Sequence, residues 1–85
     1  MHAQQQAKTV TGTVTDVSGE PIIGANIRIK GTTTGTITDI DGNFSIKAEP
    51  QSVIEVSYIG YLTQETVINN QKSIRFLLKE EYKNS

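Results

Sequence analysis

The chain has 85 residues, a formal net charge of −1 and no cysteine. This length suits one domain with one core and leaves no room for a second. Eight basic residues against nine acidic ones give no basic patch of the kind that neutralises phosphates, so we expect no nucleic-acid partner. Without cysteine there is no disulfide framework and no thiolate zinc site.

β-Branched residues dominate the composition: Thr, Ile and Val supply 28 of the 85 residues. Such side chains lose little rotamer freedom on a pleated sheet, so an all-β fold is favoured. No apolar run approaches the roughly 18 residues of a membrane-spanning helix, and we expect no direct membrane insertion. Residues 1–8 are polar and lack the apolar stretch of a signal peptide. We interpret them as a flexible lead-in, either of a mature exported chain or of a cytosolic protein.

Apolar and polar residues alternate along most of the chain, between turns rich in Gly, Pro and Asn. This pattern predicts seven short strands and no helix. The predicted strands cover residues 9–15, 25–30, 36–38, 44–46, 53–59, 61–68 and 73–79. Their spacing of roughly 8–12 residues is typical of an antiparallel two-sheet sandwich. The strand at 61–68 is the more polar one and is expected near a sheet edge.

The strongest local pattern lies in residues 35–46. Thr36–Thr38 is β-branched throughout, and Asp39–Asn43 concentrates turn formers, with Gly42 suited to a positive φ. Phe44 and Ile46 then fall on one face of the next strand. We predict a hairpin here, with Phe44 in the core, and we expect the other strands to be added to it.

The acidic turn has two interpretations. Asp39, Asp41 and Asn43 carry oxygen ligands of the kind that calcium prefers, but an EF-hand loop with Gly42 at its sixth place would need acidic residues at Ile37 and Ala48. An Asx-type turn is therefore the favoured interpretation, with calcium as the alternative. We expect no other metal and no cofactor.

No catalytic constellation is visible. The single histidine, His2, lies in the lead-in, so neither a triad nor a histidine metal site can be assembled, and we expect no enzyme. Gly31–Thr36 lacks the Lys and the following helix of a phosphate loop, and a hairpin connection is the better interpretation. Tyr58, Tyr61 and Tyr82 are candidates for a sugar-stacking platform, although core and corner positions are favoured for Tyr58 and Tyr61. Strand addition at the 61–68 edge is a further candidate for partner binding.

Three ordered segments carry a family resemblance: Val10–Val14 with Gly19–Ile27, Gly31–Thr36 with Thr38–Phe44, and Ser57–Tyr61 with Gln64–Glu65. Over about residues 9–79 this series resembles the carboxypeptidase-regulatory-like domain at the N-terminus of SusC/RagA-type TonB-dependent outer-membrane receptors. The structural fingerprint consists of Gly12, Pro21, Gly24, Gly31, Gly35, Asp39, Asp41, Gly42, Phe44, Tyr58, Gly60 and Tyr61.

The resemblance implies a transthyretin-like (prealbumin-like), seven-stranded antiparallel Greek-key β-sandwich over residues 9–79, with 80–85 as a linker or tail. It also implies a place on the periplasmic face of the outer membrane of a Gram-negative bacterium, ahead of a plug and barrel that import glycans or peptides. Residues 80–85 show no recognisable TonB box, and we expect no transport by this chain itself.

The expected function is that of a monomeric, non-enzymatic interaction or regulatory module. Its expected partner is a periplasmic protein, either a TonB-type energiser or the receptor's own plug and barrel. The alternative is a carbohydrate-binding or spacer module attached to a secreted hydrolase.

Overall fold

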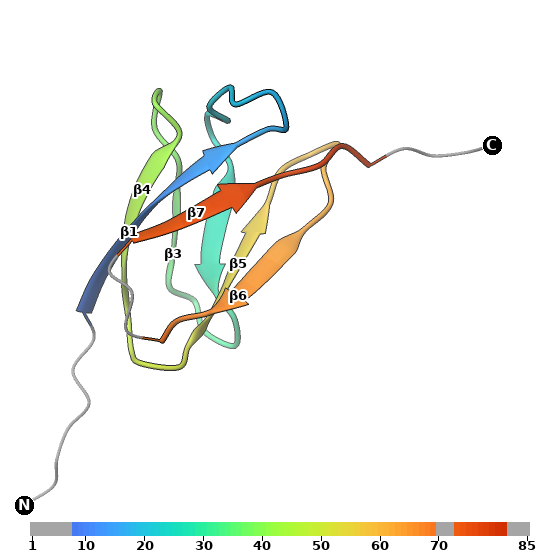
Figure 1. The fold of residues 1–85 in the computed structure, drawn as a ribbon. Helices are drawn as coiled ribbons and strands as arrows, with labels where there is room; N and C mark the ends of the chain where they lie inside the picture. The colour runs from blue at the N-terminus through green and yellow to red at the C-terminus, as the bar shows by residue number, and fades with distance from the viewer. Residues whose placement is uncertain (1–7, 70–72, 82–85) are drawn as a thin grey trace, which may run out of the picture.

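Two β-sheets pack face to face in the computed structural model, which describes residues 8–69 and 73–81 (Figure 1). The prediction of an all-β fold with seven strands is confirmed in this part of the chain. The strands are β1 (Lys8–Thr15), β2 (Asn26–Ile29), β3 (Gly35–Ile37), β4 (Asn43–Ala48), β5 (Val53–Ser57), β6 (Gln64–Val67) and β7 (Ser73–Leu77). Within the same residues there is no helix of the length and apolarity that spanning a bilayer requires.

One of the two sheets is mixed. The three-stranded sheet has the order β4-β1-β7 and the four-stranded sheet the order β3-β2-β5-β6. β1 and β7 run parallel, in a register from Thr11 opposite Ser73 to Thr15 opposite Leu77. The prediction of a wholly antiparallel sandwich is therefore wrong for this pair. The two strands come from opposite ends of the sequence, so no short turn forces them to be antiparallel.

The predicted hairpin at residues 35–46 is also wrong, because β3 and β4 belong to different sheets. β3 pairs with β2, and β4 pairs with β1. Residues 38–42 instead carry the chain from one sheet to the other. The hairpin lies one connection earlier, between β2 and β3, where the Ile29 N–H donates to the Thr34 carbonyl at 3.0 Å. The interpretation of Gly31–Thr36 as a hairpin connection is confirmed.

The predicted inward faces are confirmed. Along β1, for example, Val10, Gly12 and Val14 are buried, whereas Thr9 and Thr11 are exposed. β6 lies at the edge of the four-stranded sheet, as its polarity predicted. The buried hydrophobic side chains form one cluster between the sheets: Val10, Val14, Ile22, Ala25, Ile27, Ile29, Phe44, Ile46, Ala48, Ile54, Val56, Ile68, Phe76 and Leu78.

Phe44 fills the core of the three-stranded sheet because Gly12 makes room for it. The two residues face each other across the β1–β4 pair. A Cβ atom on Gly12 would lie 2.3 Å from the Phe44 ring, closer than non-bonded carbons approach. On its other side, Phe44 packs against Phe76 with ring centroids 6.2 Å apart, a separation typical of aromatic pairs. Gly12 therefore belongs to the fingerprint for a packing reason.

Phe44→Ala should destabilise the domain by about 3–5 kcal/mol, because it leaves a cavity between Gly12 and Phe76. At about 4–8 °C per kcal/mol, the melting temperature should fall by more than roughly 10 °C. Ser45→Ala, on the neighbouring exposed position, is the control and should stay within about 0.5 kcal/mol of the parent. Thermal denaturation followed by circular dichroism measures both, and equal melts would contradict the packing role.

Candidate interaction surface

Four segments gather at one end of the sandwich, where β1, β3, β5 and β7 all finish (Figure 1). These segments are residues 16–25, 38–42, 58–63 and 78–81, and we call this region the loop end. The connections 30–34 and 49–52 lie at the opposite end. Most of the residues singled out in the sequence fall at the loop end.

The Asp39 loop is an Asx-type turn. One carboxylate oxygen of Asp39, Oδ1, accepts the backbone N–H groups of Asp41 at 3.0 Å and Asn43 at 2.9 Å. The backbone closes the loop as well, since the Asp39 N–H donates to the Asn43 carbonyl and the Gly42 N–H donates to the Asp39 carbonyl, both at 2.9 Å. Gly42 has φ = 76°, a conformation that favours glycine. The favoured interpretation of this stretch is confirmed.

The Asp16 loop repeats the same arrangement. Oδ1 of Asp16 accepts the N–H groups of Ser18 at 2.9 Å and Glu20 at 3.0 Å. The two backbone bonds that close the loop are also present, and Gly19 has φ = 92°. The sequence analysis missed this repeat, although Thr-Asp-Val-Ser-Gly and Thr-Asp-Ile-Asp-Gly are visibly similar.

The Asp16 loop has one hydrogen bond that the Asp39 loop does not share. The Ser18 hydroxyl donates to Oδ1 of Asp16 at 2.7 Å. This bond, followed by the bond from the Glu20 N–H, lowers the pKa of the Asp16 carboxyl below its ordinary value of 3.8. Hydrogen bonds to the ionised form stabilise it, so the ionised carboxylate is the species that organises this loop.

The two Asp loops lie against each other through Gly42 and Pro21. The Val14 N–H donates to the Gly42 carbonyl at 2.8 Å, and the Ile22 N–H donates to the Val14 carbonyl at 3.0 Å. A Cβ atom on Gly42 would lie 2.7 Å from the Val14 oxygen and 2.9 Å from Cβ of Pro21. Any side chain at Gly42 would push the loops apart.

A buried hydroxyl ties the crossing between the sheets to the segment after the Asp16 loop. Thr38 is only 2% exposed. Its Oγ1 accepts the Ala25 N–H at 2.8 Å and donates to the Ile22 carbonyl at 2.6 Å. The sequence predicted Thr38 only as a strand residue, because the pattern of β-branched residues cannot distinguish a hydroxyl with buried partners from one in water.

Tyr58 and Tyr61 occupy core and corner positions. Their ring centroids lie 5.8 Å apart, and both rings are partly buried against the core cluster. Gly60 between them has φ = 86°, and the Tyr61 N–H closes the turn on the Tyr58 carbonyl at 3.0 Å. Tyr58 and Tyr61 do not form the flat, exposed pair of rings that the alternative of a sugar-stacking platform requires. Tyr82, the third candidate, lies outside the described residues.

The segment after β7 is bonded to this tyrosine turn. Tyr61 forms a bridge with Glu80. The Leu62 N–H donates to the Lys79 carbonyl and the Glu81 N–H donates to the Gly60 carbonyl, both at 2.9 Å. Glu80 and Glu81, predicted as the start of a tail, are therefore held at the loop end.

The remaining fingerprint residues serve the fold elsewhere. Gly31 and Gly35 bound the β2–β3 hairpin at the opposite end, with φ = 82° at Gly31. Gly24, with φ = 79°, lies at the loop end and donates its N–H to the Thr38 carbonyl. The fingerprint is thus a set of turn and packing positions, and its members at the loop end are Pro21, Gly24, Asp39, Asp41, Gly42, Tyr58, Gly60 and Tyr61.

No three His, Cys, Asp or Glu side chains within residues 8–69 and 73–81 are placed to hold a metal ion. Of the calcium candidates, Asp39 binds backbone N–H groups through Oδ1, and Oδ1 of Asn43 accepts the Thr13 hydroxyl at 2.8 Å. Both oxygens therefore have partners inside the protein.

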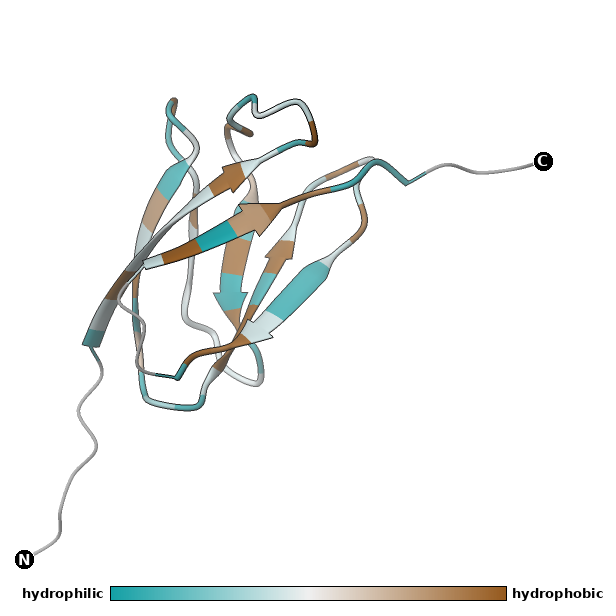
Figure 2. Cartoon of the chain, in the orientation of Figure 1, coloured by the Kyte–Doolittle hydropathy of each residue, from teal (hydrophilic) through white to brown (hydrophobic). Residues whose placement is uncertain are grey.

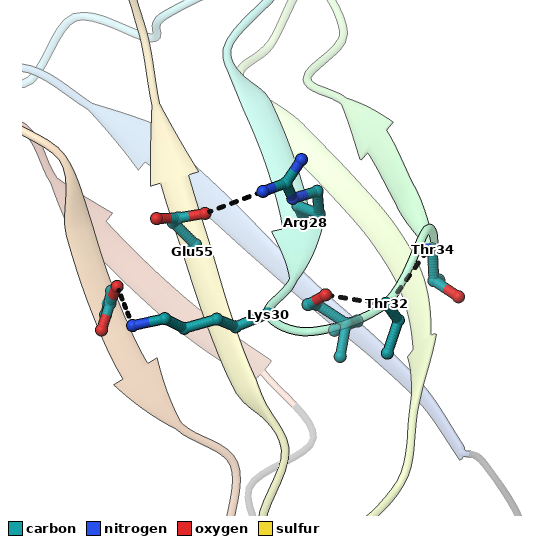
Figure 3. A network of polar contacts seen from close by, with 7 residues as sticks. Arg28, Lys30, Thr32, Thr34 and Glu55 are labelled. Carbon is teal, nitrogen blue, oxygen red and sulfur yellow. Dashed lines mark hydrogen bonds and ion pairs between the residues drawn. The ribbon is translucent and has the colours of Figure 1, made fainter.

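The outer face of the four-stranded sheet carries two ion pairs, shown in Figure 3. Nη2 of Arg28 on β2 lies 3.9 Å from Oε1 of Glu55 on β5, and Nζ of Lys30 lies 2.9 Å from Oε2 of Glu65 on β6. The hydrogen bond to Glu65 and its charge raise the pKa of Lys30. These cross-strand pairs link β2, β5 and β6 on an exposed face.

The fold defines the class of protein: a small all-β sandwich domain with one mixed and one antiparallel sheet. It is similar to a chain in the crystal structure of a type II cohesin–X-dockerin complex from Acetivibrio cellulolyticus, with a TM-score of 0.68 and 25% identity over 85% of this chain and 57% of that one. Both structures are of interface mutants of that complex, and the second gives a TM-score of 0.65 with 26% identity over 82% of this chain and 56% of that one.

Sequence comparison then gives the family. The model of the CarboxypepD_reg-like domain matches residues 10–85. TonB-dependent receptor SusC of Bacteroides thetaiotaomicron is 51% identical over 76 residues, which are 89% of this chain and 7% of that receptor. TonB-dependent receptor P39 of Formosa agariphila is 47% identical over 73 residues, 85% of this chain and 7% of that receptor.

The chain belongs to the CarboxypepD_reg-like domain family, and it matches the N-terminal region of SusC-type TonB-dependent receptors. The resemblance found in the sequence is confirmed. The chain spans about 7% of the length of these receptors.

Thr38→Val should destabilise the domain by about 1–3 kcal/mol, because it leaves the Ala25 N–H and the Ile22 carbonyl without their buried partner. Thr38→Ser keeps the hydroxyl and should retain most of the stability. Urea denaturation of the two variants measures the difference. Equal stability of the Val and Ser variants would contradict the role of the hydroxyl.

Ser18→Ala should raise the pKa of the Asp16 carboxyl toward 3.8, because it removes the bond that contributes most to the lowered value. Since the folded pKa lies below the unfolded one, Asp16 contributes stability that is present above about pH 3.8 and is lost as the pH falls through the folded pKa. NMR titration of the Asp16 carboxyl carbon measures the shift. Ser45→Ala is the control and should leave this titration unchanged.

Proposed function

We propose that this domain is a non-catalytic interaction or regulatory module, the N-terminal extension of a TonB-dependent receptor for glycans or peptides. In this proposal it lies on the periplasmic face of the outer membrane of a Gram-negative bacterium. Its partner there is a TonB-type energiser or the receptor's own plug and barrel. The observation that carries the proposal is the 51% identity to SusC across 89% of this chain.

The side chains support a non-catalytic role. The chain has no cysteine, and its single histidine, His2, precedes the described residues. The Asp39 and Asp16 carboxylates are bound into exposed turns, whereas paired-carboxylate chemistry needs a cleft around both groups. The carboxylates of the two loops are thus accounted for by hydrogen bonding within the fold.

The alternative is a carbohydrate-binding or spacer module attached to a secreted hydrolase. Its sugar-binding form would need exposed aromatic faces, but Tyr58 and Tyr61 pack on each other and on the core. The solved neighbours come from a complex between proteins, which favours an interaction or spacer role over sugar binding.

Titration separates these functions. The ¹⁵N-labelled domain should show chemical-shift changes with the C-terminal domain of a TonB protein, or with a receptor body that lacks this domain, and none with maltoheptaose. Chemical-shift changes with maltoheptaose alone would favour the alternative. An absence of changes with both the TonB domain and the receptor body would contradict the interaction role.

A further inference from the structure

Exposed aliphatic side chains are concentrated at the loop end. Of the eight large hydrophobic side chains that are exposed in residues 8–69 and 73–81, seven lie there or at the strand ends that reach it: Val17, Ile23, Ile37, Ile40, Ile59, Leu62 and Leu77. The eighth, Val67, ends β6 at the opposite end. In Figure 2, brown segments lie in the connections at the loop end, whereas connections 30–34 and 49–52 at the other end are white and teal, and the brown stretch there is the end of β6.

Hydrogen-bonded turns hold the three most exposed of these side chains, Val17, Ile40 and Ile59, which we call the aliphatic tips. Val17 is 68% exposed at the second position of the Asp16 loop, and Ile40 is 72% exposed at the same position of the Asp39 loop. Ile59 is 89% exposed in the tyrosine turn. Single exposed aliphatics are ordinary, whereas exposed apolar patches are a feature of interaction sites. Because the turns are already ordered, binding there loses little conformational entropy.

Three observations link the segments that carry these side chains. Gly42 of one Asp loop packs against Pro21, next to the other. Asn26 pairs with Ser57, which places the residues before β2 beside those after β5. Val17, Leu62 and Leu78 line one hollow between the Asp16 loop and the segment after β7.

The charges at the loop end are mostly negative. Six of the nine acidic residues lie there: Asp16, Glu20, Asp39, Asp41, Glu80 and Glu81. Two of the basic residues that the structure describes lie there: Lys79, and Arg75 of β7, which lines a hollow with the Asp16 loop. Within residues 8–69 and 73–81, none of the six carboxylates takes part in an ion pair, and the two ion pairs lie on the outer sheet face.

We infer that the loop end is a docking surface for a basic protein surface that also presents aliphatic side chains. The aliphatic tips supply the apolar centre of such an interface and the carboxylates its charged rim. A second copy of this chain would oppose carboxylate to carboxylate, and an anionic lipid surface would be repelled. The inference rests on the proposed interaction function and adds the place and the chemistry of the partner.

The test uses the 85-residue chain and two synthetic helical peptides with the same leucine positions, one carrying lysine and the other glutamate at the remaining charged positions. The lysine peptide should shift the amide signals of the three tips and their loops. Its affinity should fall severalfold when salt is raised from about 50 to about 500 mM, because exposed charges are screened. The glutamate peptide should bind at least about tenfold more weakly.

Two variants make the test specific to the surface. Val17→Ser with Ile40→Ser and Ile59→Ser should weaken binding of the lysine peptide by about tenfold or more. Val67→Ser, on an exposed aliphatic at the opposite end, is the matched control and should bind like the parent. Both variants should keep the parent's spectrum outside the changed sites, since exposed substitutions rarely disturb a fold.

Shifts confined to the β6 or β7 edges, equal binding of the two peptides, or equal weakening by Val67→Ser would each overturn the inference. The TonB domain, titrated under the same conditions, separates this inference from the proposed function. Binding of TonB away from the loop end would leave the function standing and refute the docking surface. If the lysine peptide binds at Val17, Ile40 and Ile59 but the TonB domain causes no shifts, the docking surface would stand and TonB would be refuted as its partner.

Discussion

The arrangement of this domain depends on the buried hydroxyl of Thr38. Its two hydrogen bonds, to Ala25 and Ile22, fix the point at which the chain leaves one sheet for the other. Because the crossing is fixed there, β3 and β4 face a single core from opposite sides rather than pairing with each other. The Asp39 turn then only has to reverse the chain direction, and one carboxylate oxygen with Gly42 is sufficient for that.

Alternation in the sequence predicted which side chains are buried, and it did so because a strand with one face on a core must alternate. Val10, Phe44 and Ile54 all lie where the pattern placed them. Alternation contains no information about which strand is the neighbour, however. The β3–β4 hairpin was predicted from a strong local turn, and a turn of this kind serves a crossing between sheets equally well.

The direction of β7 could not be predicted for a similar reason. It pairs with β1, from which it is separated by nearly the whole chain, so no turn chemistry reports on it. At the loop end, the sequence indicated Asp39, Asp41 and Gly42, and it contained the signal for the Asp16 loop in the repeated Thr-Asp-x-x-Gly pattern. What it could not indicate was that Val17 and Ile40 would both be exposed at the same end, since that follows from the packing of the two Asp loops through Gly42 and Pro21.

The parallel β1–β7 pair also determines how the loop end relates to the rest of a longer chain. β1 begins at the opposite end, and the parallel β7 finishes at the loop end, so the described chain enters and leaves the sandwich at different ends. The bonds from Leu62 to Lys79 and from Glu81 to Gly60 hold the exit against the tyrosine turn. Any segment joined after Glu81 would therefore start beside the aliphatic tips and the carboxylates. A partner that docks on the loop end would meet that segment as well, which is the geometry that a regulatory module needs in order to act on the chain that follows it.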